Sequence, residues 1–386
     1  MKYISLLKKC MSLFILIFLL IFAAVNAYII SRGWQLLEAA GSFRRVYLVA
    51  AVLWATLFLA GMILKRQFDS AAADALWRIG SWWLVVLLYA FLAAVGFDFL
   101  RGICWALGKK LPDIIPHYPQ LKLVLFAVFS LALAALMGVG YYNGTRAKVK
   151  TLELSVRKDV PDMQELNIVA VSDMHLGAVY TGRDVRRWIT QINALQPDVV
   201  FLLGDTFDDN PAPVIRKNTG ALFGQIHAPL GVYAITGNHE LMGRPAEAMN
   251  YLSQHGVQSL MDTAILVARR FYVVGRLDRS AWERKSIDAL TTPLNKELPV
   301  IVLDHQPYEW DAIARAGADI SLSGHTHHGQ LWPMNQLTKS MYEQDWGYLQ
   351  KGATHFYTTC GLGAWGPPIR IASRAEIVQL RVRFGK

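Results

Sequence analysis

Hydrophobic residues are distributed differently in the two parts of this chain. Before residue 143 they form four long stretches, at about 11–30, 46–64, 79–97 and 121–142. Each stretch approaches or reaches the roughly 20 residues that a helix needs to cross a bilayer, and almost no charge interrupts it. Basic residues flank the stretches, and tryptophan and tyrosine lie near their ends. The pattern predicts a region of four transmembrane helices over residues 1–142.

After residue 165 the apolar runs are short and alternate with segments of helical period. Five runs are typical of strands buried on both faces, at 166–172, 198–203, 232–236, 298–303 and 318–323. Helices are predicted between them, for example over 183–194, 246–255 and 310–316. The alternation predicts an α/β domain over 166–386, with 143–165 as a connection and first strand. Ligands of such sheets lie beyond the carboxyl ends of the strands.

Residues that bind metals follow each of the five predicted strands. The clusters are Asp173-Met174-His175, Gly204-Asp205 with Asp208, Gly237-Asn238-His239-Glu240, His305, and Gly324-His325-Thr326-His327-His328-Gly329-Gln330. A single cluster of this kind is more often a turn with a capping residue. Five in this order, all on one predicted rim of one sheet, indicate a metal-dependent hydrolytic centre.

The donor types narrow the chemistry. Carboxylate, amide and imidazole donors without thiolate suit two divalent ions drawn from manganese, iron, zinc or nickel. Two ions about 3.5–4 Å apart need a bridging ligand, hold a hydroxide at neutral pH and clamp both oxygens of a phosphoryl displacement. Asp205 can bridge them. A histidine that is not a ligand, such as His239, is placed to protonate the leaving oxygen as the general acid.

The order of these motifs resembles that of the calcineurin-like metallophosphoesterase superfamily over residues 166–384. The resemblance implies a two-sheet sandwich flanked by helices, with His239 as the active-site acid or as a clamp on a phosphate oxygen. It also implies two metal sites that share one bridging carboxylate. The first would comprise Asp173, His175, Asp205 and His327; the second would comprise Asp205, Asn238, His305 and His325. The Gly324–Gln330 motif and the Gly361–Arg370 loop are similar to the bacterial membrane-associated phosphodiesterase branch.

Two positions near the motifs, the residues after Asp208 and Arg370, give information about the kind of substrate. Protein phosphatases of the superfamily follow their GD-x-x-D motif with Arg-Gly, whereas here Asp208 precedes Asp209 and Asn210. Asp208 either orients a ligand histidine or lies in a solvated loop. Arg370 is expected either to bind a substrate phosphate as a bidentate donor or to form a structural salt bridge.

Charge supports the division into two parts. The net charge is +10; residues 1–142 contribute 13 basic against 5 acidic residues (+8), and the remainder 26 against 24 (+2). Because the excess flanks the apolar stretches, the expected partners are membrane lipids and not nucleic acid. Counting basic residues in loops near the spans gives nine on the amino-terminal side against seven on the other. This favours a multi-pass cell-membrane protein with a cytoplasmic catalytic domain.

Together these features predict a membrane-anchored two-metal phosphoesterase, most simply a phosphodiesterase. Tethering would raise its effective concentration toward a membrane-associated, lipid-linked phosphodiester or pyrophosphate. The aromatic stretch from Trp346 to Trp365 is interpreted as a loop that covers acyl chains or packs on a sheet edge. The alternatives are a metal-dependent phosphomonoesterase and a membrane sensor or scaffold with a regulatory metal domain.

Overall fold

The computed structural model describes residues 2–109 and 115–385, which form two compact units. The helical unit comprises Met1–Ile63 and Leu76–Met137, and the sheet unit comprises Leu64–Ala75 and Gly138–Lys386. The sequence placed the boundary at residue 142. The structure instead assigns the end of the last apolar helix, and a short segment between the second and third apolar stretches, to the sheet unit.

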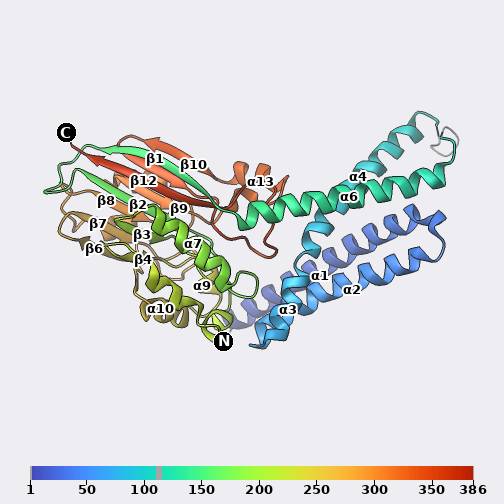
Figure 1. Ribbon diagram of the computed structural model, residues 1–386, viewed down its shortest axis with the longest axis horizontal. Helices are drawn as coiled ribbons and strands as arrows, with labels where there is room; N and C mark the ends of the chain where they lie inside the picture. The colour runs from blue at the N-terminus through green and yellow to red at the C-terminus, as the bar shows by residue number, and fades with distance from the viewer. Residues whose placement is uncertain (1, 110–114, 386) are drawn as a thin grey trace. The chain divides into compact units, whose positions relative to one another are not determined.

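Long helices make up most of the chain before residue 146 (Figure 1). They are α1 (Lys2–Leu36), η1 (Glu38–Ala40), α2 (Phe43–Gln67), α3 (Ala71–Gly80), α4 (Trp83–Ala106) and α6 (Tyr118–Thr145). Four segments are long and apolar enough to cross a membrane: Leu16–Leu36, Phe43–Gln67, Ala71–Ala106 and Tyr118–Thr145. The four predicted helices are therefore present, although a turn at residues 81–82 divides the third segment into α3 and α4.

Aromatic and small side chains hold the helices of the helical unit together. Phe22 of α1 stacks on Phe58 of α2 with ring centroids 5.4 Å apart. The indole of Trp83 in α4 donates a hydrogen bond to the Asn26 side chain of α1 at 2.9 Å. Outward-facing side chains are large and apolar, such as Leu131, which is 72% exposed. A surface of this kind is suited to lipid and not to water.

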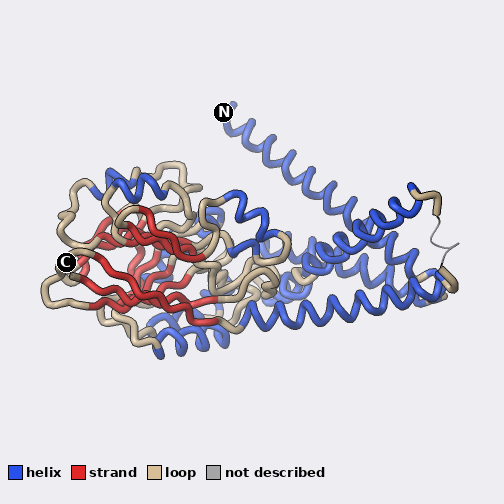
Figure 2. The backbone as a smooth tube through the Cα atoms, turned by 90° about the horizontal axis from the view of Figure 1, so that it is seen from above, coloured by secondary structure: helices blue, strands red, loops and turns tan. Residues whose placement is uncertain are grey.

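Two six-stranded sheets form the centre of the sheet unit (Figures 1 and 2). In spatial order, the first consists of β1 (Lys148–Val156), β12 (Glu376–Phe384), β2 (Glu165–Val171), β3 (Val199–Leu202), β4 (Val232–Ala234) and β5 (Val257–Ser259). The second consists of β10 (Gly347–Lys351), β11 (Thr354–Thr358), β9 (Ile320–Ser323), β8 (Val300–Leu303), β7 (Phe271–Gly275) and β6 (Thr263–Val267). Strands β2 to β5 are mutually parallel, as are β7, β8, β9 and β11.

Short helices lie between the strands, and several of them pack on the outer faces of the sheets, which confirms the predicted α/β sandwich. They are α7 (Gly182–Ala194), α8 (Ala212–Arg216), η2 (Thr219–Gln225), α9 (Asn238–Met242), α10 (Pro245–Ser253), α11 (Ile287–Thr291), α12 (Trp310–Arg315), η3 (His327–Gly329) and α13 (Met334–Met341). Strand β2 shows why its sequence is apolar throughout. Ile168 and Ala170 lie in the core between the sheets, whereas Val169 and Val171 pack in the helix-covered core with Trp188 of α7.

The last two turns of α6 pack tightly against the loop that precedes Arg370. A Cβ atom on Gly140 would lie 2.5 Å from the Ile369 side chain, and one on Gly144 would lie 2.4 Å from the Pro368 carbonyl oxygen. Only glycine permits this approach. The sequence predicted a connection from residue 143, but the helix continues to Thr145, with two residues between it and β1.

Half of the stretch from Trp346 to Trp365 is sheet. Strands β10 and β11 occupy much of it as an antiparallel pair at the edge of the second sheet. The Trp346 indole donates to the Glu376 carboxylate at 3.1 Å, and the Trp365 backbone N–H donates to the Gln330 side chain at 3.0 Å. The stretch is therefore packed on the sheet edge, the second of the two interpretations.

Candidate metal centre

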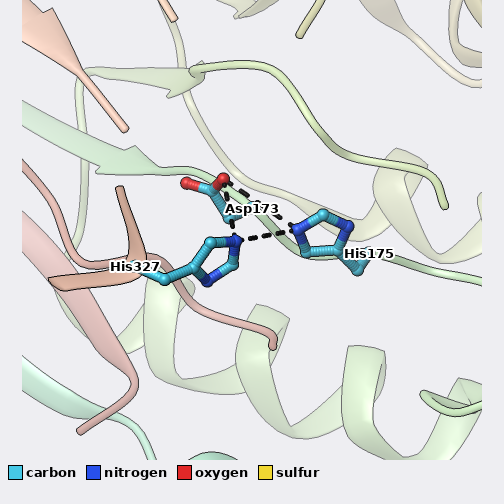
Figure 3. Close-up of side chains that lie close together, drawn as sticks. All are labelled: Asp173, His175 and His327. Carbon is cyan, nitrogen blue, oxygen red and sulfur yellow. Dashed lines mark hydrogen bonds and ion pairs between the residues drawn. The ribbon is translucent and has the colours of Figure 1, made fainter. Parts of the chain in front are cut away.

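The first group of donor atoms combines residues of the loop after β2 with the first residue of η3, and Figure 3 shows their side chains close together. Asp173, His175 and His327 each offer one ligand atom, and these atoms lie within 4.8 Å of one another. The Nε2 atoms of His175 and His327 are 3.0 Å apart, and Asp173 Oδ1 is 3.4 Å from the His327 Nε2 atom. Asp173 is fully buried and accepts the backbone N–H of His325 at 3.0 Å. The carboxylate thus ties the two histidine-bearing loops together.

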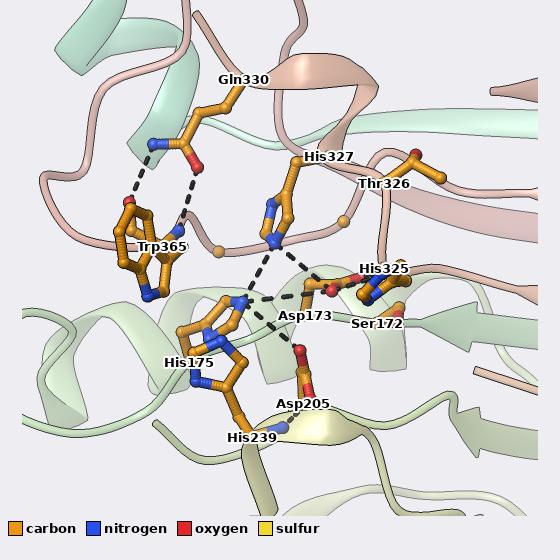
Figure 4. A network of polar contacts seen from close by, with 12 residues as sticks. Ser172, Asp173, His175, Asp205, His239, His325, Thr326, His327, Gln330 and Trp365 are labelled. Atoms are coloured by element: carbon orange, nitrogen blue, oxygen red, sulfur yellow. Dashed lines mark hydrogen bonds and ion pairs between the residues drawn. The ribbon is translucent and has the colours of Figure 1, made fainter. Parts of the chain in front are cut away.

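A second group follows β3, β8 and β9. Asp205, His305 and His325 also place their donor atoms within 4.8 Å of one another. The Asp205 Oδ2 atom is 3.3 Å from the His305 Nε2 atom and 4.0 Å from the His175 Nε2 atom of the first group. Figure 4 shows Asp205 next to the first group. One carboxylate therefore borders both sets of donors.

Left-handed backbone conformations turn these side chains inward. The φ angles of Asp173, Asp205, His325 and His327 are 53°, 48°, 71° and 49°. Such conformations cost non-glycine residues on the order of 1–3 kcal/mol each and persist only where the surrounding structure enforces them. Their concentration in the three loops that follow β2, β3 and β9 indicates that convergence of the ligands is enforced at a cost in backbone strain.

The donors fit a divalent cation. His305 Nδ1 must donate to the Leu203 carbonyl oxygen, 2.7 Å away, so the lone pair of a neutral ring would face the Asp205 carboxylate through Nε2. That contact is favourable only with a cation between the atoms, either a proton or a metal ion. Asn238, the first residue of α9, has a buried side-chain oxygen that makes no hydrogen bond within the described residues. Unpaired oxygen and nitrogen donors of this kind suit the borderline divalent metals.

Electrostatics keeps several ligands in the form that binds metal. Burial lowers the pKa of His175 to about 3. Burial, assisted by the adjacent Arg370 guanidinium, also holds the pKa of His327 well below its usual value. Both rings are therefore neutral. Burial would raise the pKa of Asp205, but the charge of His305 outweighs it and holds that pKa below its usual range.

His239 has a different environment. Its ring packs edge-to-face on His175 at 4.6 Å, and its Nδ1 atom forms ion pairs with Asp209 Oδ1 at 2.7 Å and Asp208 Oδ1 at 3.4 Å. Burial lowers its pKa, but the two carboxylates outweigh burial and raise the pKa to about 11. The two carboxylates therefore favour the protonated ring, which has a proton to donate. Asp208 is buried against it and does not lie in a solvated loop.

Glu240 is a supporting residue that the sequence analysis did not identify as one. Its carboxylate accepts the backbone N–H groups of Gly237, Asp205 and Phe207 at 2.7, 3.0 and 2.9 Å. The side chain is 1% exposed, so these bonds have no competition from water. The available signal was its place in the first turn of α9, where a carboxylate commonly accepts backbone N–H groups.

Arg370 does not occupy the position expected of a substrate ligand or of a salt bridge. The side chain is 0% exposed and donates to the Gly363 carbonyl at 2.9 Å and to the Ser373 hydroxyl at 2.8 Å. Nη1, which donates to Ser373, also lies 3.3 Å from the His327 backbone oxygen, and Nη2 lies 3.0 Å from His327 Nδ1. No carboxylate of the described residues lies within ion-pair distance of it. This placement supports a role in orienting His327.

The sandwich and the clustered aspartate and histidine donors together define a metal-dependent phosphoester hydrolase. A family model for the calcineurin-like phosphoesterases matches residues 166–329, which include all seven predicted ligands. The chain belongs to this metallophosphoesterase family.

Several curated relatives support the assignment. An uncharacterized metallophosphoesterase of Campylobacter jejuni is 28% identical over 382 residues, which cover 97% of this chain and 99% of the relative. A transmembrane protein with metallophosphoesterase domain from Bos taurus is 30% identical over 303 residues, covering 72% and 66%. An uncharacterized metallophosphoesterase of Helicobacter pylori is 28% identical over 303 residues, covering 76% and 80%. With its four apolar helices, this chain is a membrane protein.

Replacing Arg370 by Met tests its orienting role. Metal affinity is expected to fall about 10–100-fold, as is usual when a residue that orients a ligand is lost. The KM at saturating metal is expected to stay unchanged. Metal content after dialysis against a chelator measures the first quantity and steady-state kinetics the second. Arg383→Met, at an exposed arginine, is the control. A raised KM with normal metal retention would restore the substrate-binding interpretation.

Proposed function

We propose that this protein is a membrane-anchored phosphodiesterase that uses two divalent metal ions. The observation that carries the proposal is the position of Asp205, whose Oδ2 atom lies 3.3 Å from His305 and 4.0 Å from His175. A carboxylate between two sets of donors is suited to bridge two ions. His239, cationic and next to both sets, supplies the acid that a hydrolysis of this kind requires.

Each metal would be held by residues of different loops. Asp173, His175, Asp205 and His327 would hold one ion; Asp205, Asn238, His305 and His325 would hold the other. Manganese, iron, zinc and nickel all suit these donors. When bound, such a pair polarises phosphoryl oxygens and lowers the pKa of water, and no protein nucleophile is needed.

The chain's own contribution to the reaction is the proton of His239. Because Nδ1 faces the carboxylates of Asp208 and Asp209, Nε2 is the ring nitrogen that remains for substrate. A positively charged ring there favours the negative charge that develops on the leaving oxygen and then donates its proton to it.

Preference for a diester has a separate argument. A monoester carries two negative charges near pH 7, and proteins commonly bind such groups with arginine forks. The Gly361–Arg370 loop brings Arg370 to the site, but its guanidinium is bonded to protein groups. This favours a phosphodiester or pyrophosphate, with a phosphomonoester as the alternative.

The apolar helices support a substrate that resides in the membrane. Tethering raises the effective concentration of an enzyme toward a substrate in the same bilayer, such as a lipid-linked phosphodiester. We place the catalytic domain in the cytoplasm on the count of basic residues in the loops. A reporter that is active only in the cytoplasm, fused to the carboxyl terminus, tests this side.

The basic activity can be measured with chromogenic substrates. Purified full-length protein, stripped and reloaded with Mn²⁺, is expected to hydrolyse a phosphodiester faster than the matching monoester. Asp205→Asn is expected to lose metal from both sites and to lower kcat by at least about 10³-fold, because the bridging charge is absent. Metal analysis accompanies the kinetics. Faster monoester turnover would establish the phosphatase alternative, and turnover by metal-free protein would reject the two-metal mechanism.

Substitution of His239 separates catalysis from metal binding. His239→Asn is expected to retain metal but to lower kcat about 10²–10⁴-fold, the usual contribution of a general acid. The loss should be smaller for a diester whose leaving group needs no protonation. A variant with full activity on poor leaving groups would contradict the assigned role. A cellular phenotype that survives this substitution would favour the scaffold alternative.

The substrate class is tested in bilayer discs. A phosphodiester on a diacyl lipid and the same diester without acyl chains are compared with the full-length protein. The lipid form is expected to have a kcat/KM at least about tenfold higher in discs, because both partners share one surface. Similar values for the two compounds would contradict a membrane substrate, even if phosphodiesterase activity is present.

A further inference from the structure

A segment between two apolar stretches, with two basic residues near its start, lies at the candidate site. Residues Leu64–Ala75, although they separate the second and third apolar stretches, belong to the sheet unit. Lys65, in the last turn of α2, places Nζ 2.9 Å from Asp208 Oδ2. Its neighbour Arg66 places Nη2 3.1 Å from Asp209 Oδ2. These are the two carboxylates that face His239.

The two contacts differ in their burial. The side chains of Lys65 and Asp208 are only 10% and 13% exposed, so solvent screens their attraction weakly. Arg66 is 65% exposed, and an exposed pair of this kind contributes little. Of the two basic residues, Lys65 therefore has the stronger electrostatic interaction with the site.

A continuous set of contacts connects Lys65 with the metal ligands. One oxygen of Asp208 faces Lys65, and the other lies 3.4 Å from the His239 Nδ1 atom. The His239 ring in turn packs on the ligand His175. We propose that Lys65 is a positioning residue of the catalytic centre, which fixes Asp208 and through it the orientation of His239. This inference rests on the role proposed above for His239.

Other residues of the segment hold it against the sheet unit. Asp74 is 5% exposed and lies 2.6 Å from Arg216 and 3.5 Å from Lys217, and Asp69 also pairs with Arg216. None of these residues contacts a metal ligand in the described structure. Docking and positioning are therefore carried by different side chains of one segment, which allows them to be separated by mutation.

The consequence is a dependence of the chemistry itself on the membrane region. If the apolar helices served only as a tether, hydrolysis of a small soluble diester would not depend on any residue between them. If Lys65 positions His239, turnover of that same soluble compound depends on a residue at the end of the second apolar helix.

The test uses the full-length protein and a chromogenic phosphodiester with a poor leaving group. Lys65→Met is expected to lower kcat about 10–100-fold, the usual effect of losing a residue that orients a functional group. KM and metal content should change less than about threefold. Lys65→Arg keeps the charge and is expected to recover most of kcat. Asp74→Asn weakens docking of the same segment and is expected to retain wild-type kcat.

The same variants separate positioning from stability. Thermal unfolding of Lys65→Met and Asp74→Asn shows whether a loss of activity comes from a destabilised fold. The comparison is matched because each variant removes one charge of the segment. Combining Lys65→Met with Asp208→Asn is expected to cost little more than Asp208→Asn alone, because both act on His239 through one contact. Independent, additive losses would overturn the proposal.

Two further outcomes would also overturn it. Wild-type kcat in the Lys65→Met variant, with an active parent protein, would reject the positioning role and leave the phosphodiesterase proposal intact. An equal loss of kcat in Asp74→Asn would reduce Lys65 to a docking residue. An inactive parent protein with full metal content would instead reject the proposed function, and this role with it.

Discussion

Burial of two carboxylates is the constraint on which the arrangement of the site depends. Asp173 is completely buried and Asp205 nearly so, at the ends of neighbouring strands of one sheet. An unpaired charge in such a place costs several kcal/mol, so cations must approach it from elsewhere. The second sheet brings His305 and His325 to Asp205. Burial would lower the pKa of His305, but the Asp205 carboxylate outweighs burial and raises that pKa, so His305 supplies positive charge. Burial lowers the pKa of His325 to about 4, and this ring is neutral. The two sheets thus meet where a buried carboxylate of the first lies against imidazoles of the second.

Buried acidic groups farther from the ligands are also paired with positive charges or hydrogen-bond donors. Backbone N–H groups surround Glu240, which adds a further buried acid, and a lysine and an arginine face the acidic pair next to His239. Neutral imidazoles occur where a metal would supply the positive charge, and a charged imidazole occurs where carboxylates surround it. Burial therefore keeps His175 neutral, whereas adjacent carboxylates favour the charged form of His239, and the two rings pack 4.6 Å apart.

Sequence reasoning succeeded where chemistry and periodicity coincide. Six of the seven predicted ligands lie in two groups of neighbouring donor atoms. These residues follow apolar strands, so the rule that parallel strands end at a common rim was enough to predict that they lie together. It failed where the role of a residue depends on the direction of its side chain or on a contact with a residue far away in the sequence. Arg370 was recognisable as important, but loop sequence does not reveal which way a guanidinium points. Lys65 is 143 residues from Asp208, and a flanking lysine at the end of an apolar helix has an ordinary explanation in membrane topology.

The segment between the second and third apolar helices also changes what counts as the enzyme. The match to the calcineurin-like phosphoesterases begins at residue 166, and a chain shortened to that point would keep every ligand. It would also lose β1, the closely packed end of α6, and the lysine beneath Asp208. Such a fragment would contain every family motif, and its active site would still be incomplete. The functional unit of this family member is discontinuous in sequence, with one part embedded among the helices that precede it.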